Sequence, residues 1–271
     1  MNILENIKKN LQEAGVTEKC VVVISSDVRR LVRKLMDEDR REHRKRKPVD
    51  AYLDDIIAMF QQMVGKEGTL LFHTFFWSFC HGEAFDYDHT PGETGILSNH
   101  ALKRRDFLRT KHPIYSFAVW GKDKEYLVGM ENTDAFAEDS PFAYMLQKKA
   151  IYVSIDVDAW SYFHYIEQSN HVEYRFVKYF TAPYIKDGIE KLKTYSMFVR
   201  YLCLNVEQLR FWEDFLDEKS KSELLVEGIP IHVIYCEPSY RQISDDIMHN
   251  EARNLVTYDR EMASKHLQTE D

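Results

Sequence analysis

The spacing of hydrophobic residues in the first quarter of the chain predicts alternating helices and strands. Residues 1–15 are polar and helix-like, and residues 20–24 form a short continuous apolar run. Such a run between polar neighbours is typical of a strand buried on both faces. Residues 53–64 then place apolar side chains at the i, i+3, i+4, i+7 spacing of a helix, and a second apolar run, 69–72, follows. The order strand, helix, strand predicts a right-handed parallel crossover in an α/β sheet.

Cap and turn residues indicate where these elements end. Ser25, Ser26 and Asp27 follow the first apolar run and are good N-cap residues for a helix that opens at residues 28–32. Gly68 is expected to end the second helix, because glycine is a frequent helix stop.

The remaining segments extend the same sheet. Apolar runs predict strands at residues 114–120, 150–155 and 231–236. Residues 172–185 and 194–204 alternate apolar and polar side chains, which is typical of half-exposed antiparallel strands. Residues 79–109 suit a long functional loop with short helices, and helices are expected at 209–216 and after 239. We therefore expect one α/β domain over residues 1–271, with a central mixed sheet.

Composition excludes several classes of function. Only 10 of the 271 residues are glycine, and neither glycine-rich phosphate motif, G-x-G-x-x-G nor G-x-x-x-x-G-K-[ST], occurs. The formal net charge of −8 disfavours nucleic acid and anionic membrane as partners. No apolar run approaches the roughly 18 residues of a membrane span, and residues 1–15 lack a signal-peptide core. These features predict a cytoplasmic protein.

The cysteines and one basic run are interpreted as structural. Cys20, Cys203 and Cys236 lie in apolar runs and are expected to be reduced core thiols. Neither C-x-x-C nor H-E-x-x-H occurs, so no metal site is expected. The basic run 44–47 follows an acidic stretch, which favours the solvated end of a helix over a nucleic-acid patch.

A histidine and a glutamate provide the first candidate chemistry. His164 and Glu167 would lie one turn apart on a helix, where the carboxylate can set the tautomer of the imidazole and make it a general base. The alternative is a surface pair without chemistry. His112 enters a predicted strand and suits a structural role as well as a ligand role. Cys80 and His81 are sequence neighbours without a thiol-protease signature, and G-x-S-x-G is absent.

Five short motifs in a fixed order give a more specific indication. They are T-P-x-x-x-G-x-L, R-[ST]-x-H-P-x-x-S-x-A-x-x-G, S-P-F, H-x-x-E and Y-R, carried by Thr90, Pro91, Gly95, Arg109, Thr110, His112, Pro113, Ser116, Gly121, Ser140, Pro141, Phe142, His164, Glu167, Tyr174 and Arg175. In this order the chain resembles the aminoglycoside 3-N-acetyltransferase family. It is most similar to a branch found among surface-polysaccharide genes, with Lys178 and Phe180 continuing that match.

The resemblance implies an antibiotic N-acetyltransferase-like α/β/α fold, distinct from the GCN5 type, and direct acetyl transfer from acetyl-CoA to an amine. It implies that His164 is the base and that Glu167 orients it or contacts the substrate. It assigns Ser25, Ser26, Arg109, Thr110, His112 and Ser116 to the coenzyme, and Asp86, Tyr174 and Arg175 to the acceptor. The helix start after the first strand suits a pyrophosphate without glycines.

Departures from the family pattern bear on the acceptor. Ile24 stands where many members have histidine, His73 lies where proline is frequent, and Ser154 replaces a frequent glycine. We therefore expect a nucleotide-linked amino sugar of polysaccharide biosynthesis as the acceptor. The alternatives are an aminoglycoside antibiotic, or a non-catalytic sugar-binding member. Trp77, Tyr87 and Trp160 either provide stacking faces for a sugar or a nucleotide base or belong to the core. An aromatic-rich surface would allow a homodimer.

Overall fold

The first apolar run becomes a central strand of a seven-stranded sheet. The structure is a computed structural model that describes residues 2–209 and 215–267. The strands lie in the order β10 (Lys221–Val226), β11 (Ile229–Tyr235), β6 (Ile151–Ile155), β1 (Val21–Ser26), β2 (Thr69–His73), β5 (Phe117–Gly121) and β4 (Leu108–Arg109). Strand β1 runs parallel to β2 and β6, whereas β5 and β11 run antiparallel to their neighbours. The predicted mixed sheet is therefore confirmed.

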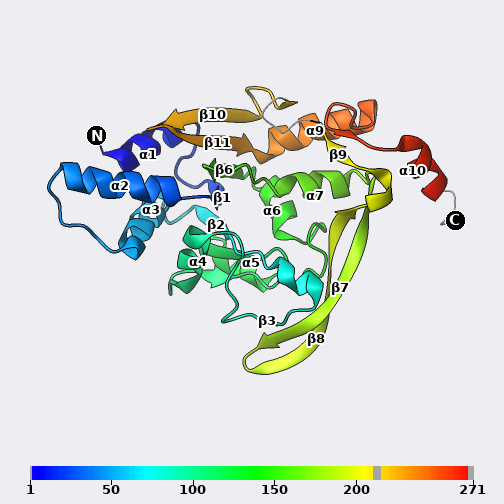
Figure 1. Ribbon diagram of the computed structural model, residues 1–271, viewed down its shortest axis with the longest axis horizontal. Helices are drawn as coiled ribbons and strands as arrows, with labels where there is room; N and C mark the ends of the chain where they lie inside the picture. Colours follow the sequence, from blue (N-terminus) through cyan, green and yellow to red (C-terminus); the bar gives the residue numbers. More distant parts are fainter. Residues whose placement is uncertain (1, 210–214, 268–271) are drawn as a thin grey trace.

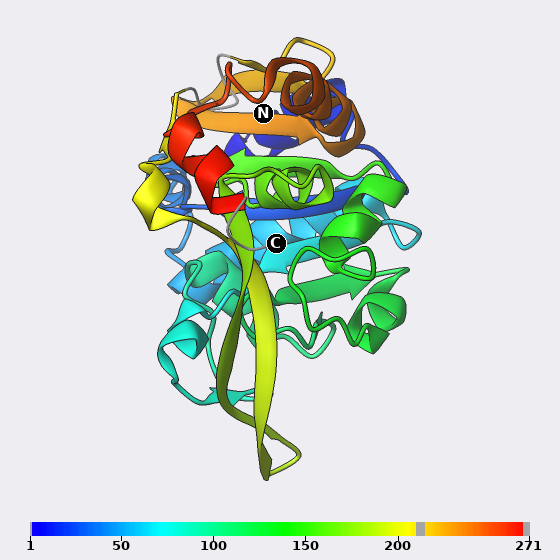
Figure 2. The same cartoon turned by 90° about the vertical axis from the view of Figure 1, so that its right-hand side faces the viewer.

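Two layers of helices explain why residues 21–24 of β1 are all apolar. Val22 and Ile24 pack into one hydrophobic cluster, and Val21 and Val23 pack into a second one on the opposite face. The first cluster is covered by α1 (Ile3–Glu13), α2 (Arg29–Arg41), α3 (Val49–Val64) and α4 (Ile96–Lys103). The second is covered by α6 (Pro141–Gln147), α7 (Tyr162–Ser169) and α9 (Cys236–Asn250). Figures 1 and 2 show the sheet between these layers.

The two alternating segments form a long hairpin, β7 (Arg175–Lys186) and β8 (Ile189–Arg200), paired antiparallel along their whole length. Figure 2 shows it extending beyond the layers. The tip end of β7 pairs with β3 (Phe85–Asp86). Smaller elements complete the described chain: η1 (Trp77–His81), α5 (Lys124–Gly129), η2 (Leu202–Leu204), β9 (Glu207–Gln208), β12 (Val256–Thr257) and α10 (Arg260–Leu267).

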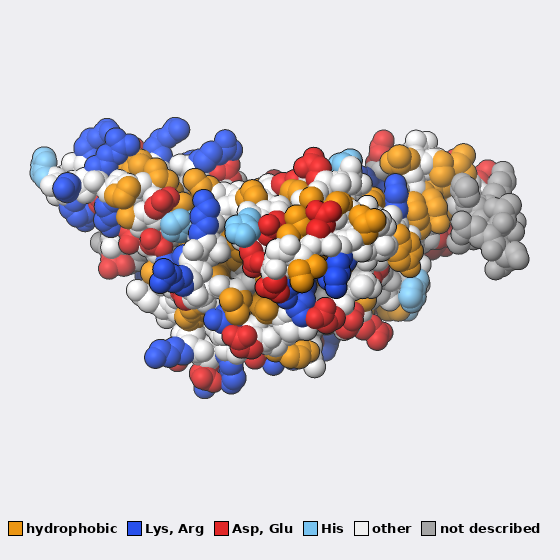
Figure 3. Space-filling model, turned by 90° about the horizontal axis from the view of Figure 1, so that it is seen from below, with side chains coloured by type: hydrophobic (Ala, Val, Ile, Leu, Met, Phe, Trp, Pro, Cys, Tyr) orange, Lys and Arg blue, Asp and Glu red, His pale blue; other side chains and the backbone are white. Residues whose placement is uncertain are grey.

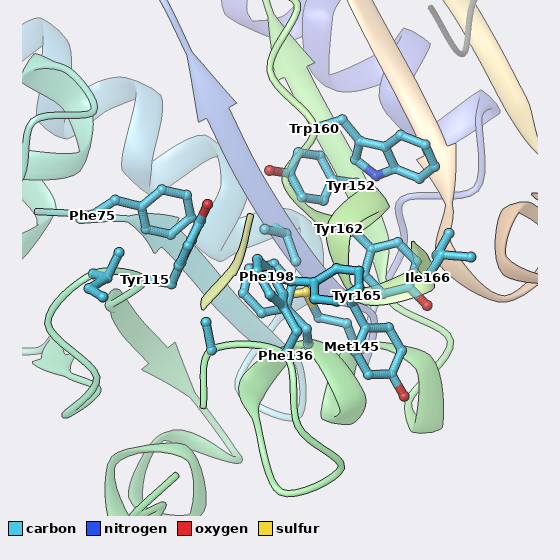
Figure 4. Close-up of a cluster of buried hydrophobic side chains, with 14 of the residues drawn as sticks. Phe75, Tyr115, Phe136, Met145, Tyr152, Trp160, Tyr162, Tyr165, Ile166 and Phe198 are labelled. Carbon is cyan, nitrogen blue, oxygen red and sulfur yellow. The ribbon is translucent and has the colours of Figure 1, made fainter. Parts of the chain in front are cut away.

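Aromatic side chains fix helix α7 against the second cluster. Tyr162, Tyr165 and Ile166 form its buried face at i, i+3 and i+4. They pack with Met145 of α6 and with Phe136 in one aromatic-rich cluster (Figure 4). Burial of several large rings holds α7, and therefore the predicted His164–Glu167 pair, in a defined place.

Three details of the sequence interpretation are wrong. Helix α3 ends at Val64, and Gly65 at φ 64° follows it, so Gly68 does not stop the helix. Gly68 instead allows close packing, since a Cβ there would lie 2.6 Å from the Val64 carbonyl oxygen. Residues 114–116 precede β5 rather than belonging to it. Cys203 is exposed because it lies in the surface turn η2, whereas Cys236 is buried as expected.

The start of α2 also differs from expectation. Ser25 and Ser26 belong to β1, and Val28 occupies the N-cap without a side-chain cap. The predicted helix at 209–216 falls mainly on residues 210–214, which lie outside the described residues. Among the residues that the structure describes, no helix has the length and apolar character needed to cross a membrane.

The basic run after α2 is tied to the acidic end of that helix. Arg44 Nε donates to Asp39 Oδ1 at 2.6 Å, and its guanidinium lies 3.5 Å from Glu38 Oε2. Figure 3 shows Lys and Arg side chains gathered at the end of the molecule that holds α2 and this loop. The ion pairs agree with a solvated helix end.

Candidate active site

A cavity of about 410 Å³ opens where β1, β2 and β6 end. This is the edge of an α/β sheet at which ligands usually bind. The cavity is lined by Ser25, Ser26, His73, Phe75, Trp77, Thr94, Tyr115, Val157, Ala159, Trp160, Ser161 and His164. Two larger hollows, about 540 and 460 Å³, lie among α1–α3 and between the α7–β7 turn and the α9–α10 region. Neither borders the ends of the parallel strands, so the smaller cavity is the candidate site.

Helix α7 brings His164 and Glu167 together as the sequence predicts. Nδ1 of His164 lies 2.8 Å from Oε2 of Glu167. The Glu167 side chain is 0% exposed, whereas the His164 side chain is 30% exposed and lines the cavity. An ionised Glu167 accepts the Nδ1 proton, which leaves the lone pair of Nε2 for a substrate. The pair therefore has the arrangement of an oriented general base.

Two further side chains surround Glu167. Nε of Arg175 lies 2.8 Å from Oε2, and the Arg175 side chain is 10% exposed. Tyr174 is buried beside the same carboxylate, and burial together with the negative charge of Glu167 raises the pKa of its hydroxyl. Neither Tyr174 nor Arg175 lines the cavity, so the structure places both behind the base. Their assignment to the acceptor stays a prediction.

A second histidine, His73 at the end of β2, lines the other side of the cavity. Its Nε2 is hydrogen-bonded to the hydroxyl of Tyr152, which lies 3.3 Å from Oγ of Ser161. Burial lowers the pKa of His73 to about 3, so the ring is neutral at ordinary pH. A neutral His73 with its proton on Nδ1 can accept a hydrogen bond from the Tyr152 hydroxyl, and it carries no charge into the cavity wall. The sequence feature that could have indicated His73 as a site residue is its position directly after the apolar run 69–72.

Acidification is expected to destabilise the protein because two buried histidines must stay neutral. Burial holds the folded-state pKa of His73 near 3 and that of His112 near 4, against about 6.5 when unfolded. The unfolded chain therefore binds more protons below pH 6.5, and stability present above that pH is lost as the pH falls. Each histidine should lower the unfolding free energy by about 2 kcal/mol between pH 7 and pH 5.

Urea unfolding at both pH values measures this loss. In His73→Gln, which keeps an acceptor for Tyr152, the loss should shrink by about 2 kcal/mol. The exposed His249 serves as the control, and His249→Gln should leave the loss unchanged. Equal losses in wild type and His73→Gln would contradict a neutral buried His73.

The residues assigned to the coenzyme separate into two groups. Ser25 and Ser26 line the cavity at the end of β1. Arg109, Thr110, His112 and Ser116 are buried and do not line it. Thr110 Oγ1 accepts the N–H of Phe117 at 2.9 Å, and His112 Nδ1 accepts the N–H of Tyr115 at 3.2 Å. The buried group thus supports the walls, and its contact with a coenzyme stays a prediction.

Arg109 is the centre of that buried group. Its Nε donates to Ser116 Oγ at 3.0 Å, and its Nη2 donates to the Thr74 carbonyl at 2.8 Å. Its Nη1 donates to the carbonyl of Thr90, and the guanidinium lies 4.4 Å from the centre of the Phe85 ring. Burial lowers the Arg109 pKa to about 10. Arg109 therefore ties the loop around Thr90 to the segment after β2.

Asp86, the remaining residue assigned to the acceptor, lies on β3 outside the cavity lining. Its carboxylate accepts backbone N–H groups of Asp88 and His89 at 3.0 and 3.1 Å, which closes a local turn. Its contact with an acceptor stays a prediction.

Aromatic rings form much of the cavity wall. Trp77 and Trp160 line it, whereas Tyr87 does not and donates instead to the Arg109 carbonyl. Phe75 and Tyr115, which the sequence interpretation missed, also line it, and their ring centres lie 4.7 Å apart. Nothing in the local pattern around Tyr115 marks it, because it reaches the site only through tertiary packing.

The molecule thus combines a mixed sheet between two helical layers with a histidine that a buried carboxylate holds at the strand ends. The family model described as aminoglycoside 3-N-acetyltransferase matches residues 43–243. The chain belongs to this family, which confirms the predicted resemblance and fold and makes it an acetyl-CoA-dependent acyltransferase by class.

Solved structures have the same fold at low sequence identity. AAC-VIa bound to sisomicin is 17% identical with a TM-score of 0.72, covering 92% of this chain and 97% of that one. AAC-IIIb in binary complex with CoASH is 15% identical with a TM-score of 0.71, covering 92% and 97%. The YokD protein from Bacillus subtilis is 18% identical with a TM-score of 0.69, covering 93% and 96%. Comparison with curated protein sequences gives no significant match.

Proposed function

We propose that this protein transfers the acetyl group of acetyl-CoA to an amine on an amino sugar, with His164 as the general base. The observation that carries the proposal is the Nδ1–Oε2 contact of 2.8 Å between His164 and the buried Glu167, at a cavity beside the strand ends. Nε2 takes a proton from the attacking amine as the N–C bond forms and the thioester C–S bond breaks. The proton then reaches the leaving thiolate.

The cavity suits the thioester end of acetyl-CoA. Its lining combines apolar rings with the hydroxyl groups of Ser25, Ser26, Thr94 and Ser161. The hydroxyl groups of Ser25 and Ser26 can stabilise the developing oxyanion, whereas the Thr94 hydroxyl already donates to the His73 carbonyl. We assign Ser25 and Ser26 to the coenzyme side, because they are the two coenzyme candidates that the structure places on the cavity.

The comparisons favour an aminoglycoside as the acceptor. The family model carries that description, and one structural neighbour is described as bound to sisomicin. They give no support to a nucleotide-linked sugar of polysaccharide biosynthesis as the acceptor. That acceptor rests on the motifs that the chain shares with the surface-polysaccharide branch of the family. No carboxylate lines the described cavity, so the extra ammonium groups of an aminoglycoside would have to lie outside it. A cytoplasmic location and a homodimer stay predictions.

A thiol-release assay separates these acceptors. We expect thiol release from acetyl-CoA with sisomicin or kanamycin as the acceptor. Thiol release with UDP-linked amino sugars, and not with these antibiotics, would favour the acceptor that the polysaccharide-branch motifs predict. Acetyl-CoA at about 100 times its Kd should add about 2.7 kcal/mol to the unfolding free energy, seen as a higher Tm. Desulfo-CoA serves as the unreactive control in turnover. No thiol release with any amine, together with no Tm shift, would contradict coenzyme binding and favour a non-catalytic sugar-binding member.

A further inference from the structure

The carboxylate that contacts His164 also has a cationic partner, Arg175. Glu167 is 0% exposed, and Oε2 lies 2.8 Å from both His164 Nδ1 and Arg175 Nε. The Arg175 Nε–H is not aligned for a hydrogen bond to that oxygen, so the contact acts through charge. Oε1 of Glu167 has no hydrogen-bond partner among the described residues. The hydroxyl groups of Tyr174 and Tyr115 also lie within electrostatic range of this carboxylate.

The charge of Arg175 has a consequence for the histidine tautomer. A buried carboxylate without a compensating cation tends to bind a proton, because the interior disfavours an isolated charge. A protonated Glu167 would donate its O–H to Nδ1 of His164. The imidazole proton would then sit on Nε2, the nitrogen that must accept a proton from the amine. The base would be blocked in its resting state.

The geometry points to Arg175 as a positioning residue for the His164 base: its guanidinium keeps Glu167 ionised and so keeps the lone pair of Nε2 in the cavity. This inference rests on the proposed acetyl transfer. Arg175 acts through Glu167 and does not line the cavity.

The hairpin holds the guanidinium in place. Arg175 is the first residue of β7, where it pairs with Arg200 of β8. Its Nη1 donates to the Phe198 carbonyl at 3.3 Å. This hydrogen bond holds the guanidinium with Nε on the side of Glu167. A lysine at this position would carry the charge but not the planar fork that makes both contacts. The end of the hairpin that holds Arg175 therefore helps to orient His164.

The test compares Arg175→Met and Arg175→Gln, which remove the charge, with Arg175→Lys, which keeps it. Arg200→Met, at the cross-strand partner, is the matched control. We expect the neutral variants to lower kcat by about 10²-fold with little change in the KM for acetyl-CoA, and Arg175→Lys to recover at least part of it. Arg200→Met should retain wild-type kcat.

Nitrogen-15 NMR of the His164 ring gives a readout that does not depend on turnover. Wild type and Arg175→Lys should carry the proton on Nδ1, and whichever neutral variant folds should carry it on Nε2. An Nε2–H tautomer in wild type, or an unchanged tautomer in a folded neutral variant, would overturn the inference. If His164→Ala keeps full turnover while the tautomer responds to Arg175, it is the proposed base chemistry that fails, and not the positioning role.

Discussion

Replacing His164 by alanine is expected to lower kcat by about 10²- to 10⁴-fold, the usual contribution of a positioned general base. The alanine removes the ring whose Nδ1 is held by Glu167 and leaves no proton acceptor on that side of the cavity. The unfolding free energy should fall by about 1–3 kcal/mol, because the buried Oε2 of Glu167 loses its Nδ1–H donor while Oε1 has no partner among the described residues. Thiol release from acetyl-CoA with a saturating amine measures the loss.

The binding of acetyl-CoA should survive this substitution. The Tm increase at saturating acetyl-CoA is expected to match that of wild type within about one degree, since Ser25 and Ser26 remain on the cavity. His249→Ala, at an exposed histidine of α9, controls for the loss of an imidazole elsewhere. Full turnover by His164→Ala would show that the His164–Glu167 pair is structural.

Replacing Arg109 by methionine is expected to lower the unfolding free energy by about 2–3 kcal/mol. Methionine matches the length of the side chain but leaves the Thr90 carbonyl without its guanidinium donor, whereas the Thr74 carbonyl keeps the Ser116 hydroxyl as a donor. A buried carbonyl left unpaired costs about 1–3 kcal/mol. The contact with the Phe85 ring is lost as well. Urea unfolding at pH 7 measures the change, and Arg105→Met at an exposed neighbour is the control.

This substitution also tests the coenzyme role that the family resemblance implies for Arg109. If Arg109 acts by supporting the cavity wall, the folded Arg109→Met variant should have a KM for acetyl-CoA similar to that of wild type. The KM is measured below the unfolding temperature of the variant. A KM raised many-fold together with wild-type stability would instead place Arg109 in contact with the coenzyme. The structure favours the supporting role, since three atoms of the guanidinium already donate within the protein.

The secondary structure could be predicted wherever burial follows a period. The run at residues 20–24 is apolar because β1 lies between two hydrophobic clusters, and the amphipathic α3 has one face on the core. Local pattern failed where tertiary contacts decide. Gly68 looked like a helix stop, but its missing side chain is needed for close packing against Val64. Cys203 sits in an apolar run whose neighbour Leu202 is itself 92% exposed, so apolar sequence did not mean burial there.

The candidate site was predictable to the extent that it lies on one helix. The spacing of His164 and Glu167 implies a contact within one turn, and the structure shows it. His73 and Tyr115 could not be placed in the same cavity, because they come from separate segments that only the order of strands brings together.

The sequence alone determined the α/β pattern, the histidine–glutamate pair and the family, because periodicity and motif spacing are local properties of the chain. Tertiary structure decided which of the motif residues face the cavity and which support it. Arg109, Thr110, His112 and Ser116 share a motif, yet they turn into the core to satisfy buried polar groups. Arg175 reaches Glu167 because the short turn between α7 and β7 places the first residue of β7 beside this carboxylate, whose buried charge a nearby cation compensates.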